Sequence, residues 1–383
     1  MAAELKKLAE NRPLRVVGLM SGTSMDGVDA AWVETNGETV ATFGPSHALS
    51  YPSAFRARLH KFVSSVPDKD HGDAAALDAE LTDFHAAAVK ALIAEVGAAP
   101  DLVGFHGQTI WHRPHARQTW QMGDGQRLAQ ALNVPVVYDF RSNDVAHGGQ
   151  GAPLLPLFHV ALASALPKPL GVLNIGGVSN VTWIGEKVIG EKKTDVNGHA
   201  FPFAILGFDT GPGNAMMDDW MLKHTGRAMD ENGAMARAGS VDATRLAKLM
   251  ASPFIREAPP KSLDRLAFDA SVLDGLSVAD GAATMAEFTA ATVAAALAHC
   301  PSPPHQLLVT GGGRHNPVLM ERVAALTRIP VAPVEAAGWN GDMMEAQGFA
   351  YFAARLVRGL PLTYPDVTGA PTPLPGGVLV HPR

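Results

Sequence analysis

The sequence is poor in cysteine and lacks long apolar runs. Its 383 residues include a single cysteine, Cys300. This excludes an intramolecular disulfide and any zinc or iron–sulfur site built on several cysteines. No uninterrupted apolar run reaches the roughly 18 residues expected of a membrane-spanning helix. We therefore expect a chain of the reducing cytoplasm that has no membrane partner.

An excess of positive charge is also lacking. The 31 Lys and Arg residues are outnumbered by 37 Asp and Glu residues, which gives a net charge of −6. The chain thus has no basic footprint for nucleic acid. Hydrophobic residues make up 47% of the sequence, enough to fill large cores and too many for a disordered chain. At about 150 residues per domain, this length predicts two to three domains.

Two segments of the chain share one pattern, a strand, a glycine-containing turn and a second strand. Residues 15–20 and 28–33 form the first such unit, which is a β-hairpin signal. Residues 170–175 and 181–184 form the second. Long helices are expected at 72–98, 281–299 and about 342–358. The pattern predicts two related α/β halves with a ligand-binding cleft between them.

The first half is expected to be discontinuous in the sequence. We place the first domain at residues 1–140 plus about 355–383, and the second at 141–354. Buried strands are expected to end where polar residues begin: at 102–105 before His106, and at 204–208 before Asp209. Carboxyl ends of strands are where open α/β sheets bind ligands.

The turn from Ser21 to Gly27 is the first candidate site. Its small residues let a ligand approach the backbone, and its successive N–H groups can form an anion nest. Asp26 could hold a metal ion or its water shell. An ordinary hairpin turn is the alternative interpretation.

Asp209 is the candidate general base. It leaves a buried strand in the segment Gly207-Phe-Asp-Thr-Gly-Pro-Gly-Asn214, where glycines allow a substrate to come close. The alternative is an Asx turn or a helix cap, although Asn214 could supply the cap and leave Asp209 available.

Two further segments are glycine-rich. Gly311, Gly312 and Gly313 follow a buried strand and precede a helix, which suits an adenosine or phosphate group on bare backbone. Residues 141–153 read as a polar loop lining a pocket. The nearby histidines 106, 112 and 115 lack a zinc-ligand spacing, so we expect hydrogen bonding there. No P-loop, protein-kinase or hydrolase-elbow motif is present.

Together these features resemble the sugar kinase–actin–heat-shock ATPase superfamily. Six longer blocks resemble one family in it, anhydro-N-acetylmuramic acid kinase, and occur in that family's order: Gly18-Leu-Met-Ser-Gly-Thr-Ser-Met-Asp-Gly27, Phe105-His-Gly-Gln-Thr109, Gly148-Gly-Gln-Gly-Ala-Pro-Leu154, Asn174-Ile-Gly-Gly177, Gly207 to Asn214 and Pro365-Asp-Val-Thr-Gly369. The chain departs from the family at Ser142, at His147 and after Pro260-Lys261-Ser262, where Leu263-Asp264 replaces Thr-Gly.

The resemblance implies a two-domain actin-like (ribonuclease H-like) α/β fold with an interdomain cleft. It implies a cytoplasmic, homodimeric kinase that uses ATP, Mg²⁺ and water in peptidoglycan recycling. The enzyme would open the 1,6-anhydro ring and phosphorylate O6, with Asp209 taking a proton from the attacking water. Glu345, Arg141 and Asp144 would bind the sugar, and Asp26 is the candidate Mg²⁺ ligand. The ATP-binding residues would be Gly22, Thr23, Ser24, Met25, Asp26, Gly27, Val28, Asp29 and Gly311 to Gly313.

Two other functions remain open from the residues alone. Another sugar kinase of the superfamily would keep Asp209 as base but deprotonate a sugar hydroxyl. A nucleotide-dependent sensor or clamp would use ATP without sugar chemistry.

Overall fold

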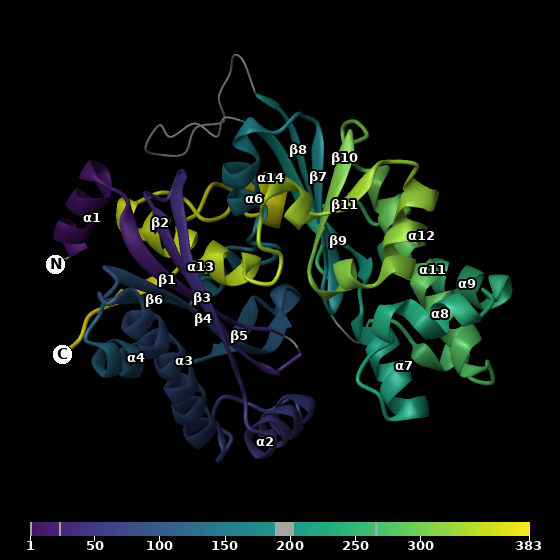
Figure 1. The fold of residues 1–383 in the computed structure, drawn as a ribbon, viewed down its shortest axis with the longest axis horizontal. Helices are drawn as coiled ribbons and strands as arrows, with labels where there is room; N and C mark the ends of the chain where they lie inside the picture. The colour runs from purple at the N-terminus through teal and green to yellow at the C-terminus, as the bar shows by residue number, and fades with distance from the viewer. Residues whose placement is uncertain (1, 23, 188–202, 265–266) are drawn as a thin grey trace. The chain divides into compact units, whose positions relative to one another are not determined.

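The computed structural model describes residues 2–22, 24–187, 203–264 and 267–383. The chain divides into two compact units (Figure 1). The first holds the described residues up to Ser164 together with Met343–Arg383. The second holds the described residues from Ala165 to Asp342. Thr23 lies outside the described residues.

The described part of the first unit contains a seven-stranded sheet and the helices that precede its strands or lie between them in the sequence. Its strands are β1 (Leu14–Ser21), β2 (Gly27–Thr35), β3 (Val40–Ser50), β4 (Leu102–Arg113), β5 (Gln118–Met122), β6 (Val136–Tyr138) and β12 (Val378–Val380). Its helices are α1 (Ala2–Asn11), α2 (Ser53–Ser64), α3 (Ala74–Val96), α4 (Gly125–Leu132), α5 (Ser142–Ala146), α6 (Pro156–Leu162), α13 (Met344–Arg358) and α14 (Pro365–Thr368).

The sheet of the first unit has the order β12-β6-β4-β1-β2-β3, with β5 paired to β4. The hairpin β1–β2 is antiparallel, whereas β1–β4 and β4–β6 are parallel. Helix α13 packs along β1, β2 and β4, and α3 contacts β2 and β3. The contact with α13 is so close that a Cβ on Gly18 would lie 1.8 Å from the carbonyl oxygen of Ala346.

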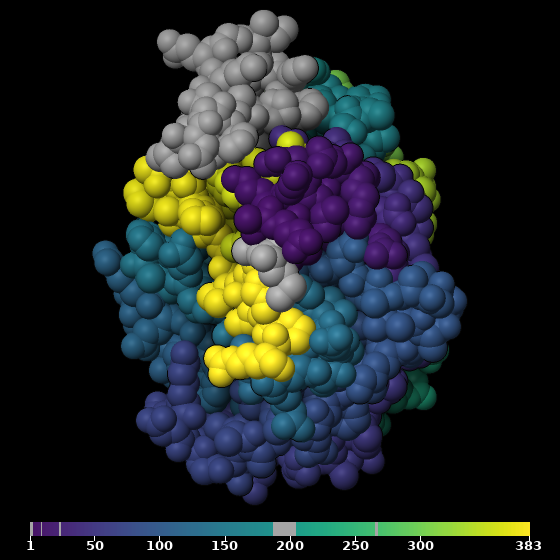
Figure 2. Space-filling view, turned by 90° about the vertical axis from the view of Figure 1, so that its left-hand side faces the viewer, coloured from purple at the N-terminus to yellow at the C-terminus, as the bar shows by residue number. Residues whose placement is uncertain are grey.

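The C-terminal segment closes one edge of the first sheet. Strand β12 pairs antiparallel with β6, and Gln126 Nε2 on α4 donates a hydrogen bond to the His381 carbonyl oxygen at 2.9 Å. Figure 2 shows these C-terminal residues, in yellow, on the surface of the first unit. No described helix is long and apolar enough to cross a membrane.

The second unit repeats the same strand order. Its strands are β7 (Leu170–Ile175), β8 (Val178–Lys187), β9 (Phe203–Pro212), β10 (Gln306–Thr310) and β11 (Val331–Pro333). The sheet order β9-β8-β7-β10-β11 corresponds to β3-β2-β1-β4-β6, with an antiparallel hairpin followed by two parallel neighbours in both units. The expected pair of related α/β halves, each of the ribonuclease H-like type found in actin-like ATPases, is confirmed.

The helices of the second unit gather around α11. They are α7 (Ala215–Thr225), α8 (Ala234–Ala238), α9 (Ala243–Met250), α10 (Pro253–Arg256), α11 (Val278–Leu297) and α12 (Pro317–Thr327). Helix α11 contacts α7, α8, α9, α12 and strand β9, so it forms the centre of this core. Its alanine-rich sequence allows this close packing on several sides.

Several elements differ from the sequence expectations. Strand β4 continues through His106–Thr109 because β5 pairs with its second half. Strand β9 continues through Asp209 to Pro212 because β8 pairs with it there. The loop at 141–153 contains the short helix α5. Strand β3 and helix α2 were not expected at all.

The unit boundaries also differ from the expected ones. The structure places residues 141–164 and 343–354 in the first unit rather than in the second. The physical reason is local: Arg141 bonds to His106 of β4, Asp144 bonds to Thr368, and α13 packs on β1 and β4 from its first turn. The segment from 141 is thus held by contacts within the first unit.

Candidate active site

The turn between β1 and β2 is tight and partly exposed. Met25 has a positive φ of 50°, and its N–H donates to the Gly22 carbonyl oxygen at 3.1 Å. Ser24 Oγ donates to Asp26 Oδ1 at 2.8 Å, and both side chains are exposed. Met25 and Val28 instead bury their side chains in the core, so they can offer only backbone groups to a ligand. Asp29 lies on β2 opposite Met20.

A buried polar chain supports this turn from below. Tyr51 Oη donates to Ser21 Oγ at 2.9 Å, and Ser21 Oγ donates to Gln108 Oε1 at 2.7 Å. Burial raises the pKa of Tyr51, so its hydroxyl stays protonated. Sequence reasoning missed Tyr51, which follows the end of β3, and it missed the bond between Ser21 and Gln108 of β4, because only the folded sheet brings these residues together.

The buried ring of His106 and the half-buried side chain of Arg141 form a hydrogen-bonded pair in the first unit. Arg141 Nε donates to His106 Nε2 at 3.0 Å, and Arg141 Nη1 donates to the Gly151 carbonyl oxygen at 2.7 Å. His106 Nδ1 lies 2.8 Å from the Gly107 carbonyl oxygen, which assigns it the proton. Burial and the Arg141 charge hold the pKa of His106 well below its usual value, so the ring is neutral.

Glu345 lies in the first turn of α13, where the charge of Arg141 acts on it. Burial raises the pKa of this carboxyl, and the Arg141 guanidinium partly opposes the rise. The ring of Phe349, one turn further along α13, lies 4.5 Å from the ring of His106. The fold thus brings Arg141 and Glu345, two of the expected sugar-binding residues, into one electrostatic cluster with His106.

Asp144 holds the glycine-rich loop. Its Oδ1 accepts a hydrogen bond from Thr368 Oγ1 at 2.7 Å, and its Oδ2 accepts one from the Gly151 N–H at 2.6 Å. The side chain is 1% exposed. Since Gly151 is the residue whose carbonyl Arg141 binds, Asp144 and Arg141 fix the two sides of the same peptide segment.

Asp209 lies inside β9, three residues before the strand ends. Its backbone N–H donates to the Lys261 carbonyl oxygen at 3.1 Å, and its Oδ2 accepts from the Leu263 N–H at 2.8 Å. The neighbours Phe208 and Thr210 are fully buried, while Asp209 itself keeps 7% exposure. A carboxylate on a paired strand has a rigid support, which suits a general base.

Glycine segments meet beside Asp209 at the end of the second sheet. The Asn214 N–H donates to the Gly176 carbonyl oxygen at 2.7 Å, and a Cβ on Gly213 would lie only 2.1 Å from that oxygen. Asn214 Nδ2 donates to the Ile175 carbonyl oxygen and lies 3.4 Å from where a Cβ on Gly312 would be. The hairpin turn, the end of β9 and the Gly311–Gly313 turn therefore adjoin one another.

The sequence suggested Asn214 as a helix cap, and the structure shows no capping bond from its side chain. The residue does occupy the N-cap position of α7. Asn316 caps α12 by accepting from the N–H groups of Val318 and Leu319. Gly312 begins the 3₁₀ turn Gly312–His315. Arg314 Nη1 stabilises this turn by donating a hydrogen bond to the Gly311 carbonyl oxygen at 3.0 Å.

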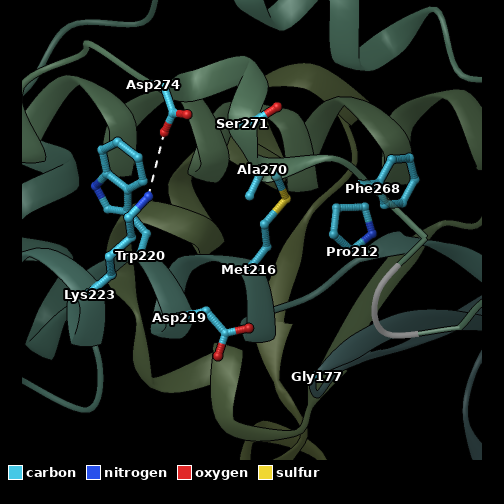
Figure 3. A pocket seen from close by; sticks show the side chains of 10 residues that line it. All are labelled: Gly177, Pro212, Met216, Asp219, Trp220, Lys223, Phe268, Ala270, Ser271 and Asp274. Atoms are coloured by element: carbon cyan, nitrogen blue, oxygen red, sulfur yellow. Dashed lines mark hydrogen bonds and ion pairs between the residues drawn. The ribbon is translucent and has the colours of Figure 1, made fainter. Parts of the chain in front are cut away.

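A pocket opens on the α7 side of the glycine segments (Figure 3). Its apolar lining comes from Pro212, Met216, Trp220 and Phe268, and Gly177 forms part of its wall. The pair Lys223 and Asp274, 3.5 Å apart, lies at its polar side. Apolar pockets with a few polar groups are typical small-molecule sites.

The described part of the chain contains no group of three or more His, Cys, Asp or Glu side chains that could hold a metal ion. His112 is hydrogen-bonded as expected, to Thr119 Oγ1 and to the Gln150 carbonyl oxygen. Asp26 remains the candidate cation ligand. Burial raises the pKa of Cys300 to about 12, so its thiol stays protonated.

Comparison with known proteins supports the resemblance found in the sequence. The family model described as anhydro-N-acetylmuramic acid kinase matches residues 14–381. The anhydro-N-acetylmuramic acid kinase of Acidiphilium cryptum is 52% identical over 374 residues, covering 96% of this chain and 99% of that protein. The one from Rhodospirillum rubrum is 51% identical and covers 94% of this chain and 92% of that protein.

Solved structures are more distant. A ligand-bound xylulose kinase from Lactobacillus acidophilus is 10% identical, with a TM-score of 0.46, and covers 96% of this chain and 94% of that chain. A glucokinase from Streptomyces griseus, solved with glucose and AMPPNP, is 15% identical, with a TM-score of 0.41, and covers 89% of this chain and 99% of that chain. The family model and the curated relatives decide the assignment: the chain belongs to the anhydro-N-acetylmuramic acid kinase family and is an enzyme of the kinase class.

Proposed function

We propose that the enzyme opens the 1,6-anhydro ring of anhydro-N-acetylmuramic acid and phosphorylates O6 with ATP. Water attacks C1 and the C1–O6 bond breaks. O6 then takes the γ-phosphoryl group, so the products are N-acetylmuramic acid 6-phosphate and ADP. The observation that carries this proposal is the carboxylate of Asp209, which is buried on a paired strand with 7% of its surface exposed and is held by a backbone N–H. The proposal includes peptidoglycan recycling in the cytoplasm and a homodimer, which rest on the family alone.

Asp209 acts as the general base. It accepts the proton of the attacking water as the water oxygen bonds to C1. The Leu263 N–H donates to Oδ2 of this carboxylate and fixes its orientation. A positioned base of this kind contributes on the order of 10² to 10⁴ in rate.

The glycine segments of both units bind the nucleotide. Phosphoryl transfer depends on positioning and charge neutralisation more than on covalent participation. In the first unit Gly22 and the residues from Ser24 to Asp29 offer their backbone, and Ser24 its hydroxyl, to phosphate oxygens. In the second unit Gly311 to Gly313 offer bare backbone beside Asn214.

Asp26 fits a Mg²⁺ ligand. Its carboxylate is exposed and accepts a hydrogen bond from the Ser24 hydroxyl. Mg²⁺ prefers one or two carboxylates together with water and phosphate oxygens. When bound, the ion supplies neutralisation of phosphate charge.

Arg141 and Glu345 bind the sugar in the first unit. Arg141 offers a fixed cation, and Glu345 offers acceptor oxygens within the field of that cation. Asp144 keeps the loop in place, because both of its oxygens hold protein donors.

The test combines ADP release with mass spectrometry of the product formed in ¹⁸O-water. Anhydro-N-acetylmuramic acid and N-acetylmuramic acid are each offered to wild type and to Asp209→Asn. We expect turnover of the anhydro sugar, ¹⁸O at C1 and a loss of at least about 10²-fold in kcat for the variant. Asp269→Asn changes an exposed carboxyl of the same unit and is the matched control.

Three results contradict the proposal in different ways. Full activity of Asp209→Asn removes Asp209 as base. Turnover of N-acetylmuramic acid alone leaves another sugar kinase. ADP release that no sugar stimulates favours a nucleotide-dependent sensor.

A further inference from the structure

We propose that Lys261 is a positioning residue for Asp209: its buried ammonium anchors the segment 261–263, whose backbone holds the Asp209 carboxylate. This inference rests on the proposed role of Asp209 as general base. It assigns a function to a buried cation that the reaction itself does not require.

Lys261 is an unusual lysine because it is only 3% exposed. Lysine is almost never fully buried unless it is paired. Its Nζ donates to the Phe254 carbonyl oxygen on α10 at 2.8 Å. The same atom lies 4.4 Å from the centre of the Phe254 ring and 5.9 Å from that of Phe208. Cation–π contacts of this kind are strongest when they are desolvated.

The two aromatic rings that Lys261 contacts belong to two different elements, α10 and β9. Phe254 belongs to α10, which packs on β9 and α11, and Phe208 immediately precedes Asp209 in β9. The side chain of Lys261 therefore ties the segment to the helix and to the strand that carries the base.

The backbone of the segment in turn fixes Asp209 at two points. The Asp209 N–H donates to the Lys261 carbonyl oxygen at 3.1 Å, and the Leu263 N–H donates to Asp209 Oδ2 at 2.8 Å. Both the main chain and the carboxylate of Asp209 thus bond to the same three residues. A displacement of the segment moves the carboxylate with it, and a 1 Å misplacement of a reacting group can cost about 10²-fold in rate.

Electrostatics favour the same arrangement. Burial lowers the pKa of Lys261, whereas the charges of Asp209 and Glu257 oppose that change. Because the interaction is reciprocal, a charged Lys261 favours the ionised form of Asp209, which is the form that accepts a proton. Lys261 therefore acts on both the orientation and the charge of the base.

The experiment compares Lys261→Met with Lys261→Arg and Lys261→Gln in steady-state kinetics across pH. Methionine keeps an apolar stem between the two rings but has no charge and no N–H donor. We expect kcat to fall by about 10- to 100-fold with little change in either KM. We also expect the acid limb of the kcat/KM profile to move to higher pH. Arginine keeps the charge, so the acid limb should return to its wild-type position with partial recovery of kcat.

Lys261→Gln separates the anchor from the charge. Its amide can still donate a hydrogen bond, so kcat should lie nearer to wild type while the acid limb stays displaced. Lys248→Met removes an exposed lysine of α9 in the same unit and should leave both quantities unchanged.

The outcomes distinguish this inference from the proposed function. If Asp209→Asn is inactive while Lys261→Met keeps the wild-type kcat and acid limb, the positioning role is refuted and the base stands. If Asp209→Asn is active, the proposed function has failed first. If both uncharged variants lose their fold and their affinity for ADP, Lys261 maintains the whole unit, and the specific role is refuted as well.

Discussion

Replacement of Gly18 by alanine perturbs the packing between the first sheet and α13. A Cβ at this position would lie 1.8 Å from the Ala346 carbonyl oxygen and 2.5 Å from the Ala350 nitrogen. Both atoms belong to the helix backbone, so no side-chain rotation can relieve the contact. Gly104 on β4 faces the same helix, and its Cβ would lie 2.2 Å from the Phe349 carbonyl oxygen. Helix α13 therefore rests on two glycines of neighbouring strands.

The loss of stability in Gly18→Ala can be worked out from these Cβ-to-backbone distances. Real Cβ contacts below 3.0 Å are essentially never found, so α13 must retreat from β1 by about 1 Å. Overpacking a core costs about 1–3 kcal/mol, and a backbone-on-backbone clash belongs at the upper end, about 3 kcal/mol. For a unit of about 200 residues this corresponds to a Tm lower by about 6–12 °C. Glu345 precedes Ala346, so the same retreat should reduce kcat/KM for the sugar by up to about 10²-fold.

Differential scanning calorimetry with sugar kinetics tests this prediction. Gly72→Ala is the matched control, because nothing lies within 4 Å of its Cβ position, and its Tm should match wild type. A Tm for Gly18→Ala within about 1 °C of that control would refute the packing argument. Normal stability together with lost activity would show instead that α13 shifts without strain.

Two further predictions concern the cluster in the first unit. Burial raises the pKa of Glu345, so the folded state holds its proton more tightly than the unfolded state, and stability falls as pH rises above the ordinary value of 4.5. The urea midpoint of Glu345→Gln should therefore be higher than that of wild type at pH 7, and the difference should disappear below pH 4.5. In the same variant kcat/KM for the sugar should fall by about 10-fold or more. Equal urea midpoints at pH 7 would contradict the pKa argument. Arg141→Lys should raise KM for the sugar by about 10-fold and leave KM for ATP unchanged. A single ammonium group cannot replace the guanidinium, which donates to both His106 and Gly151. Unchanged sugar kinetics would show that Arg141 is not a sugar ligand.

The strand pattern was readable from the sequence where apolar residues were continuous. The hairpins at Leu14–Thr35 and Leu170–Lys187 were found because buried runs flank short glycine turns. Strand β3 was missed because its residues are mostly exposed and form no apolar run. The ends of β4 and β9 were misplaced because polar residues there are held by cross-strand hydrogen bonds, which composition does not show.

Candidate residues were readable where a motif kept them together in the chain. Asp209, the turn around Asp26 and the glycines from Gly311 onward all lie in short segments with recognisable chemistry. Their individual roles stay predictions.

The partners of these residues were decided by the tertiary structure alone. The hydrogen-bonded residues lie far apart in the sequence: Arg141 and His106 are separated by 35 residues, Thr368 and Asp144 by 224, and Leu263 and Asp209 by 54. Short-range patterns determine which backbone forms each strand or turn, because side-chain periodicity and glycine conformations act locally. Which side chains then share a buried hydrogen bond depends on how sheets and helices pack, and that is set by the whole chain at once.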